Sequence, residues 1–558
     1  MTHADLVFTG GPVFTANTVR SHATAVAVSG GRIVAVGSPD DVRDLIGSRT
    51  EVVDLAGRML LPGFQDAHVH PVWGGLDLMR CDLSELGTER EYLARIGAYA
   101  AGQADEPWVL GGGWQMSAFP GGTPTAAALD TVVAGRPAFL PNRDGHGAWV
   151  NSAALRLAGI DRNTPDPTDG RIERDAAGNP TGTLHEGAMT LVNRHLPETS
   201  VETLTEALLL GQRYLHSYGV TAWQDAIIGS YGDAGDPAPA YLAAAASGAL
   251  TGRVVGALWW DRTAGLEQIP SLVERRERLV IAPTEGRGGR FAATSIKIMQ
   301  DGVAENFTAS MLDPYRDAHG HVTDNSGISF VPPEILNEAV PQLDALGFQL
   351  HFHAIGDRAV RECLDAVEHA IARNGRNDQR HHIAHIQVVH PEDIPRFREL
   401  GVVANMQSLW AALEPQMVEL TLPFLGSPRD AWQYPFGDLL RSGAVLAAGS
   451  DWSVSTPNPL AAIHVAVNRK AAPGYEEGEY DAFLPQQAID LGTSLTAYTA
   501  GSAFVNRLDD TGTVEVGKLA DLVVLDRDPF AGPSSEIGAT RVLQTFVEGE
   551  RVYAASDA

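Results

Sequence analysis

The sequence predicts an α/β protein, a (β/α)8 TIM barrel with a small composite β-sandwich domain built from both termini. Three observations support this fold class. Both ends of the chain are rich in strand signals, the long middle alternates short apolar runs with longer amphipathic stretches, and side chains able to bind metal stand at the ends of several apolar runs.

The two ends of the chain are predicted to form hairpins. Two runs rich in β-branched residues flank the turn Ser29–Gly30–Gly31, and two similar runs flank Glu548–Gly549–Glu550 near the C-terminus. Two β-rich ends around a different middle indicate one composite domain from residues 1–60 plus 508–558. The remainder, 61–507, is then the barrel.

The middle of the chain carries the pattern of a parallel barrel. Eight short apolar runs lie at 61–69, 219–227, 253–260, 294–299, 348–353, 382–388, 402–406 and 445–450. The clearest helix between them is predicted over 357–373, with apolar residues at helical spacing, Asp357 as its cap and Gly375 after its end. The gap from 70 to 219 is too long for one crossover, so we expect an insertion at about 100–200, forming a lid or subdomain near the barrel mouth.

Composition excludes several functional classes. The 558 residues contain 41 Lys+Arg against 69 Asp+Glu, a net charge of −28, whereas phosphate binding needs clustered Lys and Arg. No run approaches the roughly 20 apolar residues that cross a bilayer. Cys81 and Cys363 are expected as buried thiols of a cytoplasmic protein. A small-molecule substrate is therefore expected, with no nucleic-acid or membrane partner, and a homo-oligomer is left open.

Histidines and an aspartate at predicted strand ends form a candidate metal site. In a strand, residues two apart point to the same side, so both imidazoles of His68–Val69–His70 would converge on one point. His353, which shares a face with His351, and His385 lie towards the mouth of the barrel. Asp451 follows the eighth run, where it is either a structural ion-pair partner or a metal ligand and general base.

Lys297 is the unusual member of this group. It stands between two isoleucines that face the other way, so it shares the side of the histidines. A lone ammonium beside metal ions would be repelled. The lysine must therefore be neutral, paired, or converted by CO2 to a carbamate, whose two oxygens could bridge two metals.

These residues together resemble the amidohydrolase superfamily, metal-dependent hydrolases on a (β/α)8 barrel. The family pattern is a His-x-His in strand one, an often carboxylated lysine in strand four, histidines after strands five and six, and an aspartate after strand eight. The matching residues are His68, His70, Lys297, His353, His385 and Asp451. The segment 517–525 resembles the family's flanking β-sandwich.

Four shorter motifs resemble one branch of the family, which includes N-substituted formamide deformylase. They are Gly112–Gly113–Trp114, Asp144–Gly145–His146, His353–Ala354–Ile355–Gly356–Asp357 and Gly449–Ser450–Asp451–Trp452. The sequence departs from the branch at Gln115, where an aspartate is frequent, and at Ala384, where a glutamate often stands. Neither departure removes a predicted metal ligand. Both therefore bear on substrate binding and on the residues that support the metal ligands.

The resemblance implies two divalent ions, most simply zinc, although composition does not distinguish zinc from manganese, iron or cobalt. His68, His70 and Asp451 would hold the buried ion and His353 and His385 the outer one, with carboxylated Lys297 and a hydroxide bridging them. The hydroxide would attack the amide, and the catalytic Asp451 would pass its proton to the leaving nitrogen. The implied reaction is hydrolysis of a non-peptide C–N bond in an N-substituted formamide or related N-acyl amine.

Four further residues are predicted to contact the substrate. Trp114 and His146, in the insertion, could supply an apolar wall and a hydrogen-bond donor over the site, or Trp114 could simply pack the lid. Asp301 and Glu305 follow strand four and are expected as polar groups of the pocket.

Two alternative functions stay open. The same metals could serve a cyclic amide or carbamate hydrolase, or a deaminase of a nitrogen heterocycle. The chain could also be a non-catalytic, amidohydrolase-like assembly module. Such modules usually lose ligands, and all six are present here.

Overall fold

The barrel sheet consists of eight parallel strands, in sequence order around the ring. In the computed structural model, which describes residues 3–556 except 134, 231–234, 281–289 and 476–477, each strand pairs with the next. The strands are β8 (Phe64–Val69), β15 (Val220–Ile228), β16 (Arg253–Trp259), β17 (Phe291–Met299), β18 (Gln349–Ala354), β19 (His382–His385), β20 (Val403–Met406) and β21 (Leu446–Ala448). The Asp451 backbone N–H donates to the His68 carbonyl at 2.8 Å, which brings the last strand against the first. The barrel is therefore nearly closed.

Each of the eight predicted runs overlaps a barrel strand, with one difference at the first. Leu60–Pro62 forms a separate strand, β7, which pairs with the terminal strands, and Gly63 divides it from β8. A side chain on Gly63 would collide with Thr221, so the chain passes there without one. The run 61–69 is thus shared between two sheets.

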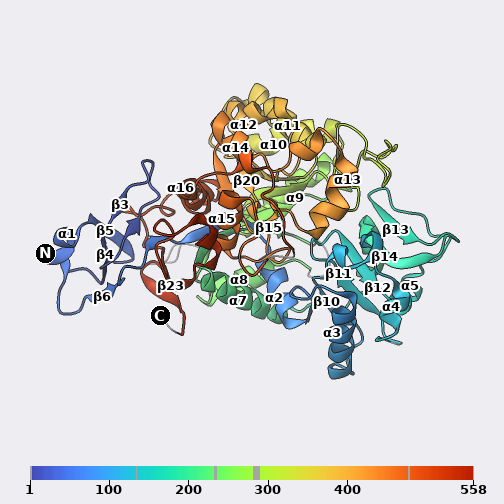
Figure 1. Cartoon of the computed structure of the whole chain (residues 1–558), viewed down its shortest axis with the longest axis horizontal. Helices are drawn as coiled ribbons and strands as arrows, with labels where there is room; N and C mark the ends of the chain where they lie inside the picture. The colour runs from blue at the N-terminus through green and yellow to red at the C-terminus, as the bar shows by residue number, and fades with distance from the viewer. Residues whose placement is uncertain (1–2, 134, 231–234, 281–289, 476–477, 557–558) are drawn as a thin grey trace.

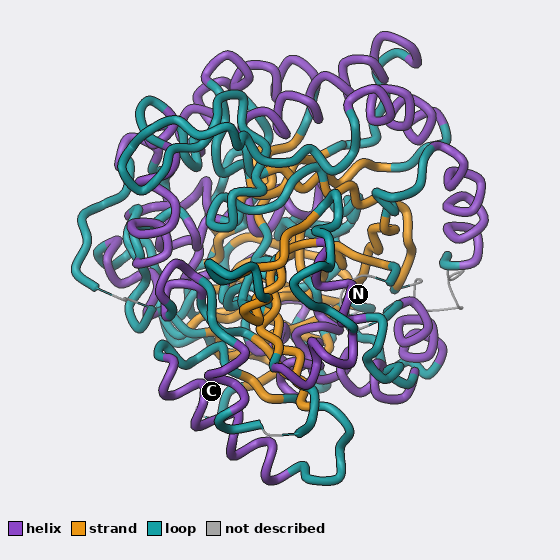
Figure 2. The backbone as a smooth tube through the Cα atoms, turned by 90° about the vertical axis from the view of Figure 1, so that its right-hand side faces the viewer, coloured by secondary structure: helices purple, strands orange, loops and turns teal. Residues whose placement is uncertain are grey.

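Helices cover the outside of the barrel strands, as Figures 1 and 2 show. They are α2 (Pro71–Met79), α7 (Val201–Ser217), α8 (Ala238–Ala246), α9 (Ile269–Arg278), α10 (Pro333–Ala345), α11 (Asp357–Asn374), α12 (Ile394–Leu400), α14 (Phe436–Ser442), α15 (Pro459–Asn468) and α16 (Leu491–Thr496). The predicted helix 357–373 is confirmed as α11, ended by Gly375. Its N-cap is Gly356, so Asp357 is the first helical residue and not the cap; the Asp357 side chain accepts a hydrogen bond from the Leu312 backbone N–H.

The segment between β8 and β15 builds a second sheet beside the barrel. Its six strands are β9 (Cys81–Asp82), β10 (Val109–Gly112), β11 (Ala138–Pro141), β12 (Gly147–Val150), β13 (Gly170–Arg174) and β14 (Pro180–Glu186). Helices α3 (Glu89–Gly102), α4 (Ala126–Asp130) and α5 (Ser152–Ala158) accompany them. Two apolar clusters, around Trp114 and around Phe139, give this segment a core of its own.

The two termini form two further sheets on the opposite side of the barrel from the insertion (Figure 1). One contains β1 (Leu6–Thr9), β4 (Ala25–Ser29), β5 (Arg32–Gly37) and β6 (Glu51–Asp54). The other contains β2 (Val13–Phe14), β3 (His22–Ala23), β7, β22 (Leu522–Leu525), β23 (Val542–Val547) and β24 (Glu550–Ala554). Both predicted hairpins are present as β4–β5 and β23–β24. Whether the two sheets form one composite sandwich domain stays a prediction.

Two other expectations concern the whole described chain. Cys81 and Cys363 are buried and unpaired, as predicted. Among the described residues, no helix combines the length and apolar character needed to cross a membrane.

Candidate metal centre

The six predicted ligands line one cavity at the carboxyl ends of the barrel strands. His68 lies in β8 and His70 directly after it, at the N-cap of α2. Lys297, His353 and His385 lie near the ends of β17, β18 and β19, and Asp451 follows β21. The carboxyl ends of the parallel strands therefore bring all six side chains to one cavity, although they are separated by up to 383 positions in the chain (451 − 68).

Asp451 lies at the centre of the group. Its Oδ1 is 3.2 Å from His68 Nε2 and 3.1 Å from His70 Nε2, and its Oδ2 is 3.9 Å from His385 Nδ1. Lys297 Nζ lies 3.4 Å from His68 Nε2. The His353 and His385 rings are 4.3 Å apart. One ligand atom each from His68, His385 and Asp451 fit within 4.8 Å of one another, a spacing suited to a shared cation.

The chemistry of this donor set fits a divalent cation. Both ring nitrogens of His385 are buried without a hydrogen-bond partner in the described part of the chain, a costly arrangement for a polar group unless a ligand occupies it. Burial, and then the charge of neighbouring groups, holds the pKa values of His68, His353 and His385 well below their usual range. These imidazoles are therefore neutral, as metal coordination requires.

The two other ionisable groups of the centre have shifted pKa values. Burial lowers the pKa of Lys297 to about 7, although Asp451 opposes this shift. Burial alone would raise the pKa of Asp451, but the hydrogen bond from His70 and the nearby His385 lower it below the usual value. Near neutral pH the site thus combines a carboxylate with an amine that is partly neutral.

Two of the predicted ligands have strained backbones. His385 has φ 77° and Asp451 has φ 55°, in the left-handed region that L-residues with side chains rarely occupy. Such strain costs about 1–3 kcal/mol per residue and is typical of functional sites. Both strained residues line the cavity.

Asp66, which the sequence analysis missed, joins the first and last strands beneath the ligands. Its carboxylate accepts hydrogen bonds from the backbone N–H of His68 at 3.0 Å and of Ser450 at 3.1 Å. Asp66 stands two positions before His68, on the same side of β8, and that spacing was the signal available in the sequence. It thus links β8, which carries His68, to Ser450, the residue directly before Asp451.

A second layer of histidines lies deeper in the barrel. His68 Nδ1 is 2.7 Å from His351 Nε2, and the His351 ring is 4.1 Å from that of His382. His382 is fully buried and bonds to Gln224 and Asn405. His351 therefore hydrogen-bonds Nδ1 of His68, so that Nε2 of His68 is left to face the candidate metal centre.

Of the four predicted substrate contacts, His146 alone lines the cavity. Trp114 is buried in the insertion, where it packs on Phe119 and Trp149 and its Nε1–H donates to the Leu140 carbonyl. Trp114 thus packs the lid, the alternative stated above. Its neighbour Gln115 is also buried away from the cavity.

Asp301 and Glu305 also lie off the cavity wall, because the loop after β17 turns their carboxylates into the protein. Asp301 is fully buried and accepts backbone hydrogen bonds from Ser310, Ile355 and Gly356. Glu305 accepts a hydrogen bond from Thr421. Glu305 therefore supports a loop, whereas Asp301 supports a loop and also places its Oδ1 3.7 Å from Nε2 of the cavity residue His353.

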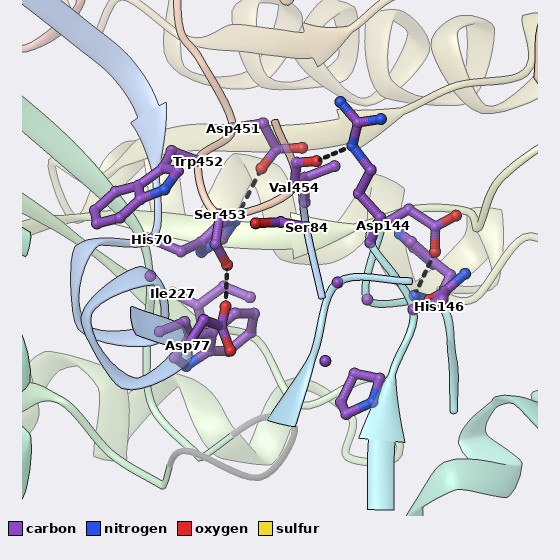
Figure 3. A pocket seen from close by; sticks show the side chains of 18 of the residues that line it. His70, Asp77, Ser84, Asp144, His146, Ile227, Asp451, Trp452, Ser453 and Val454 are labelled. Carbon is purple, nitrogen blue, oxygen red and sulfur yellow. Dashed lines mark hydrogen bonds and ion pairs between the residues drawn. The ribbon is translucent and has the colours of Figure 1, made fainter. Parts of the chain in front are cut away.

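Apolar side chains form much of the wall around the centre. Figure 3 shows His70, Asp451 and Trp452 on one side of the pocket and Asp144 and His146 on the other. The apolar wall includes Trp73, Leu76, Phe139, Met189, Trp410 and Trp452. Trp73 stacks on His70 and Trp410 stacks on His385, so aromatic rings flank both ends of the ligand set.

His146 has an acidic partner in the insertion. Its Nδ1 lies 2.8 Å from Glu186 Oε1. Burial lowers the pKa of His146, but the charge and hydrogen bond of Glu186 outweigh burial and raise it to about 9. Glu186 was not recognised in the sequence because the strand that carries it was not predicted.

Comparisons with known proteins agree with this geometry. The sequence profile of the amidohydrolase family matches residues 51–553. The chain is 32% identical to Protein LONG AFTER FAR-RED 3 of Arabidopsis thaliana, over 99% of this chain and 92% of that protein. It is 28% identical to N-substituted formamide deformylase of Arthrobacter pascens, over 98% of each.

A solved structure shows the same fold. An uncharacterized metal-dependent hydrolase from Pyrococcus horikoshii superimposes with a TM-score of 0.72 at 24% identity, covering 95% of this chain and 99% of that one.

Proposed function

Because the chain belongs to the amidohydrolase family and is a metal-dependent hydrolase, we propose that it cleaves the C–N bond of an N-substituted formamide or a related N-acyl amine. The observation that carries this proposal is the convergence of four imidazoles, an amine and a carboxylate on one cavity with an apolar wall. The likeness to the Arthrobacter pascens deformylase along the whole chain supports the substrate class.

In this proposal His68, His70 and Asp451 would hold one zinc ion and His353 and His385 a second, and Lys297, as a carbamate, would add oxygen ligands. Bound divalent ions would supply a water molecule of lowered pKa and polarise the acyl oxygen. The amine of Lys297 must be neutral to add CO2, and its pKa of about 7 leaves a substantial neutral fraction near neutral pH.

Asp451 is the proposed proton carrier. Its lowered pKa keeps the carboxylate ionised near neutral pH. It would take the proton of the attacking water and deliver it to the departing nitrogen, which otherwise leaves poorly as an amide anion. The bond from its backbone N–H to His68 holds it at the junction of the first and last strands.

The cavity wall fits an uncharged substituent on the amide nitrogen. Trp73, Phe139, Met189 and Trp452 would take an alkyl or aryl group out of water. A small acyl group such as formyl would then lie towards the ligands, with the larger amine part towards this wall.

A substrate panel tests the proposal. Protein reconstituted with zinc would be incubated with N-butylformamide, N-butylacetamide, a lactam, a cyclic carbamate and an aminated heterocycle. We expect butylamine and formate or acetate from the linear amides. Ring opening would instead support the cyclic-amide function, and release of ammonia the deaminase. A protein that binds no metal and turns over nothing would support the assembly module.

We also propose that the terminal sheets form one composite domain, 1–60 plus 508–558, beside a barrel of 61–507. An apolar cluster draws on both sheets and supports this division, with Phe8 and Phe546 in edge-to-face contact at 5.2 Å. A small-molecule substrate and a cytoplasmic location remain part of the proposal.

A further inference from the structure

Glu186 and His146 face one another across two strands of the insertion sheet. His146 directly precedes β12, and Glu186 is the last residue of β14, the antiparallel neighbour of β12. The Glu186 backbone N–H donates to the His146 carbonyl at 3.0 Å. The pair is therefore tied together through the main chain as well as through the side chains.

One oxygen of Glu186 collects all its side-chain bonds. Glu186 Oε1 accepts from His146 Nδ1 at 2.8 Å, from Thr308 Oγ1 at 2.9 Å and from Asn306 Nδ2 at 3.3 Å. The Glu186 side chain has no exposed surface, and its Oε2 has no partner among the described residues. Burying a carboxylate oxygen that has no hydrogen-bond partner costs free energy of folding, which suggests that the residue is kept for a function.

Two backbone features accompany the burial of Glu186. Its φ is 52° with ψ −128°, a strained combination for a residue with a side chain. A Cβ atom on Gly302, in the loop after β17, would collide with Glu186 Oε1 and with Thr308. The insertion and the barrel loop therefore meet at this carboxylate.

The other edge of the imidazole faces the cavity. His146 lines the cavity, with its ring 5.4 Å from the ring of His353. Because Nδ1 is bound to Glu186, Nε2 is the nitrogen left for a molecule in the cavity. The ring thus reaches the side of the centre where the acyl group would lie.

We propose that Glu186 is a positioning residue that fixes the ring of His146, and that His146 Nε2 hydrogen-bonds the amide group of the substrate. This inference rests on the proposed function. An amide offers both a carbonyl oxygen and an N–H, so a ring held in this orientation finds a partner whether Nε2 donates or accepts. The orientation of the ring is the property that Glu186 supplies.

The chain contains a matched control pair. On the same sheet, His185 Nε2 lies 3.1 Å from Glu173 Oε1, but neither residue lines the cavity. Glu173 has the same chemistry as Glu186 and the same kind of partner. Replacing Glu173 therefore measures how the loss of a Glu–His pair in the insertion sheet affects activity when the pair does not face the cavity.

The experiment compares Glu186→Leu, Glu186→Gln, His146→Phe and Glu173→Leu with the unchanged enzyme. Each would be assayed for kcat and KM on the best linear amide of the panel, for zinc content and by crystallography. We expect kcat/KM to fall about 10- to 100-fold in Glu186→Leu and His146→Phe. Glu186→Gln should stay within about fivefold, since its amide oxygen can still accept the three bonds at Oε1. Glu173→Leu should stay within about twofold.

Zinc content should be equal in all five proteins, and in crystals the His146 ring should leave its position in Glu186→Leu but keep it in Glu186→Gln. A ring that stays in place in Glu186→Leu would overturn the positioning role. Unchanged kcat/KM in His146→Phe would overturn the contact with substrate. If the unchanged enzyme hydrolyses no amide, the proposed function fails, and the crystal comparison still decides whether Glu186 fixes the ring.

Discussion

At the scale of single residues, the centre depends on pairs in which one side chain sets the protonation state or the orientation of another. Asp451 stays ionised because His70 bonds to it, and His68 presents Nε2 because His351 takes its Nδ1 side. The ligand positions were predictable, since residues two apart in a strand share a side and the strand ends meet at one mouth. Glu186 was missed because the strand that carries it was not predicted. Asp66 was missed because its spacing from His68 does not by itself reveal the bond to the Ser450 backbone.

Replacing Asp451 by Asn tests its role as proton carrier. The amide cannot take up the proton of the attacking water, so we expect kcat to fall at least about 100-fold while KM changes less. Steady-state kinetics on zinc-loaded protein, with metal content measured in parallel, gives the result. Near-normal kcat in fully loaded Asp451→Asn would eliminate the role.

Replacing His351 by Leu tests the deeper histidine layer. Without a partner at Nδ1, the orientation of His68 is no longer fixed, and we expect zinc affinity to fall about 10- to 100-fold. The control is His381→Leu, which removes a buried histidine bonded to Asp344 outside the ligand set. Chelator competition should show a weakened site in the first variant and an unchanged site in the second. A zinc affinity of His351→Leu equal to that of His381→Leu would refute the supporting role of His351.

At the scale of secondary-structure elements, the strands were predictable and the loops between them were not. Short apolar runs between amphipathic stretches identified all eight barrel strands, and helical spacing identified α11. Asp301 and Glu305 follow β17 as expected, yet neither lines the cavity. Backbone N–H groups hold Asp301 behind His353, and Thr421 binds Glu305. The strands of the insertion are short and interrupted by Gly and Pro, so no periodicity marked them.

Asp301 provides a test at this scale. Asp301→Ala would leave three buried N–H groups without partners and loosen the loop after β18, which follows His353. We expect the free energy of unfolding to fall by about 2–4 kcal/mol. Asp301→Asn, which keeps one acceptor oxygen, should lose less. Urea unfolding of the metal-free proteins measures both, and a loss in Asp301→Ala no greater than in Asp301→Asn would contradict this account of the loop.

At the scale of the whole molecule, the barrel lies between two additions with separate cores, the insertion sheet and the terminal sheets (Figure 1). The insertion supplies His146 and Phe139 to the cavity, so the site is complete only when insertion and barrel are packed together. The sequence indicated an addition of this size from the length of the gap. The sheet of the insertion, and the Glu186–His146 pair within it, could be identified only from the structure.

The most direct test of the account is a crystal structure of the zinc-loaded protein, with anomalous diffraction recorded on both sides of the zinc edge. We predict two anomalous peaks in the cavity, contacted by His68, His70, His353, His385 and Asp451, with electron density for a carbamate on Lys297 between them. A loaded crystal with no peak among these side chains, or with zinc bound elsewhere, would contradict the assignment of the centre.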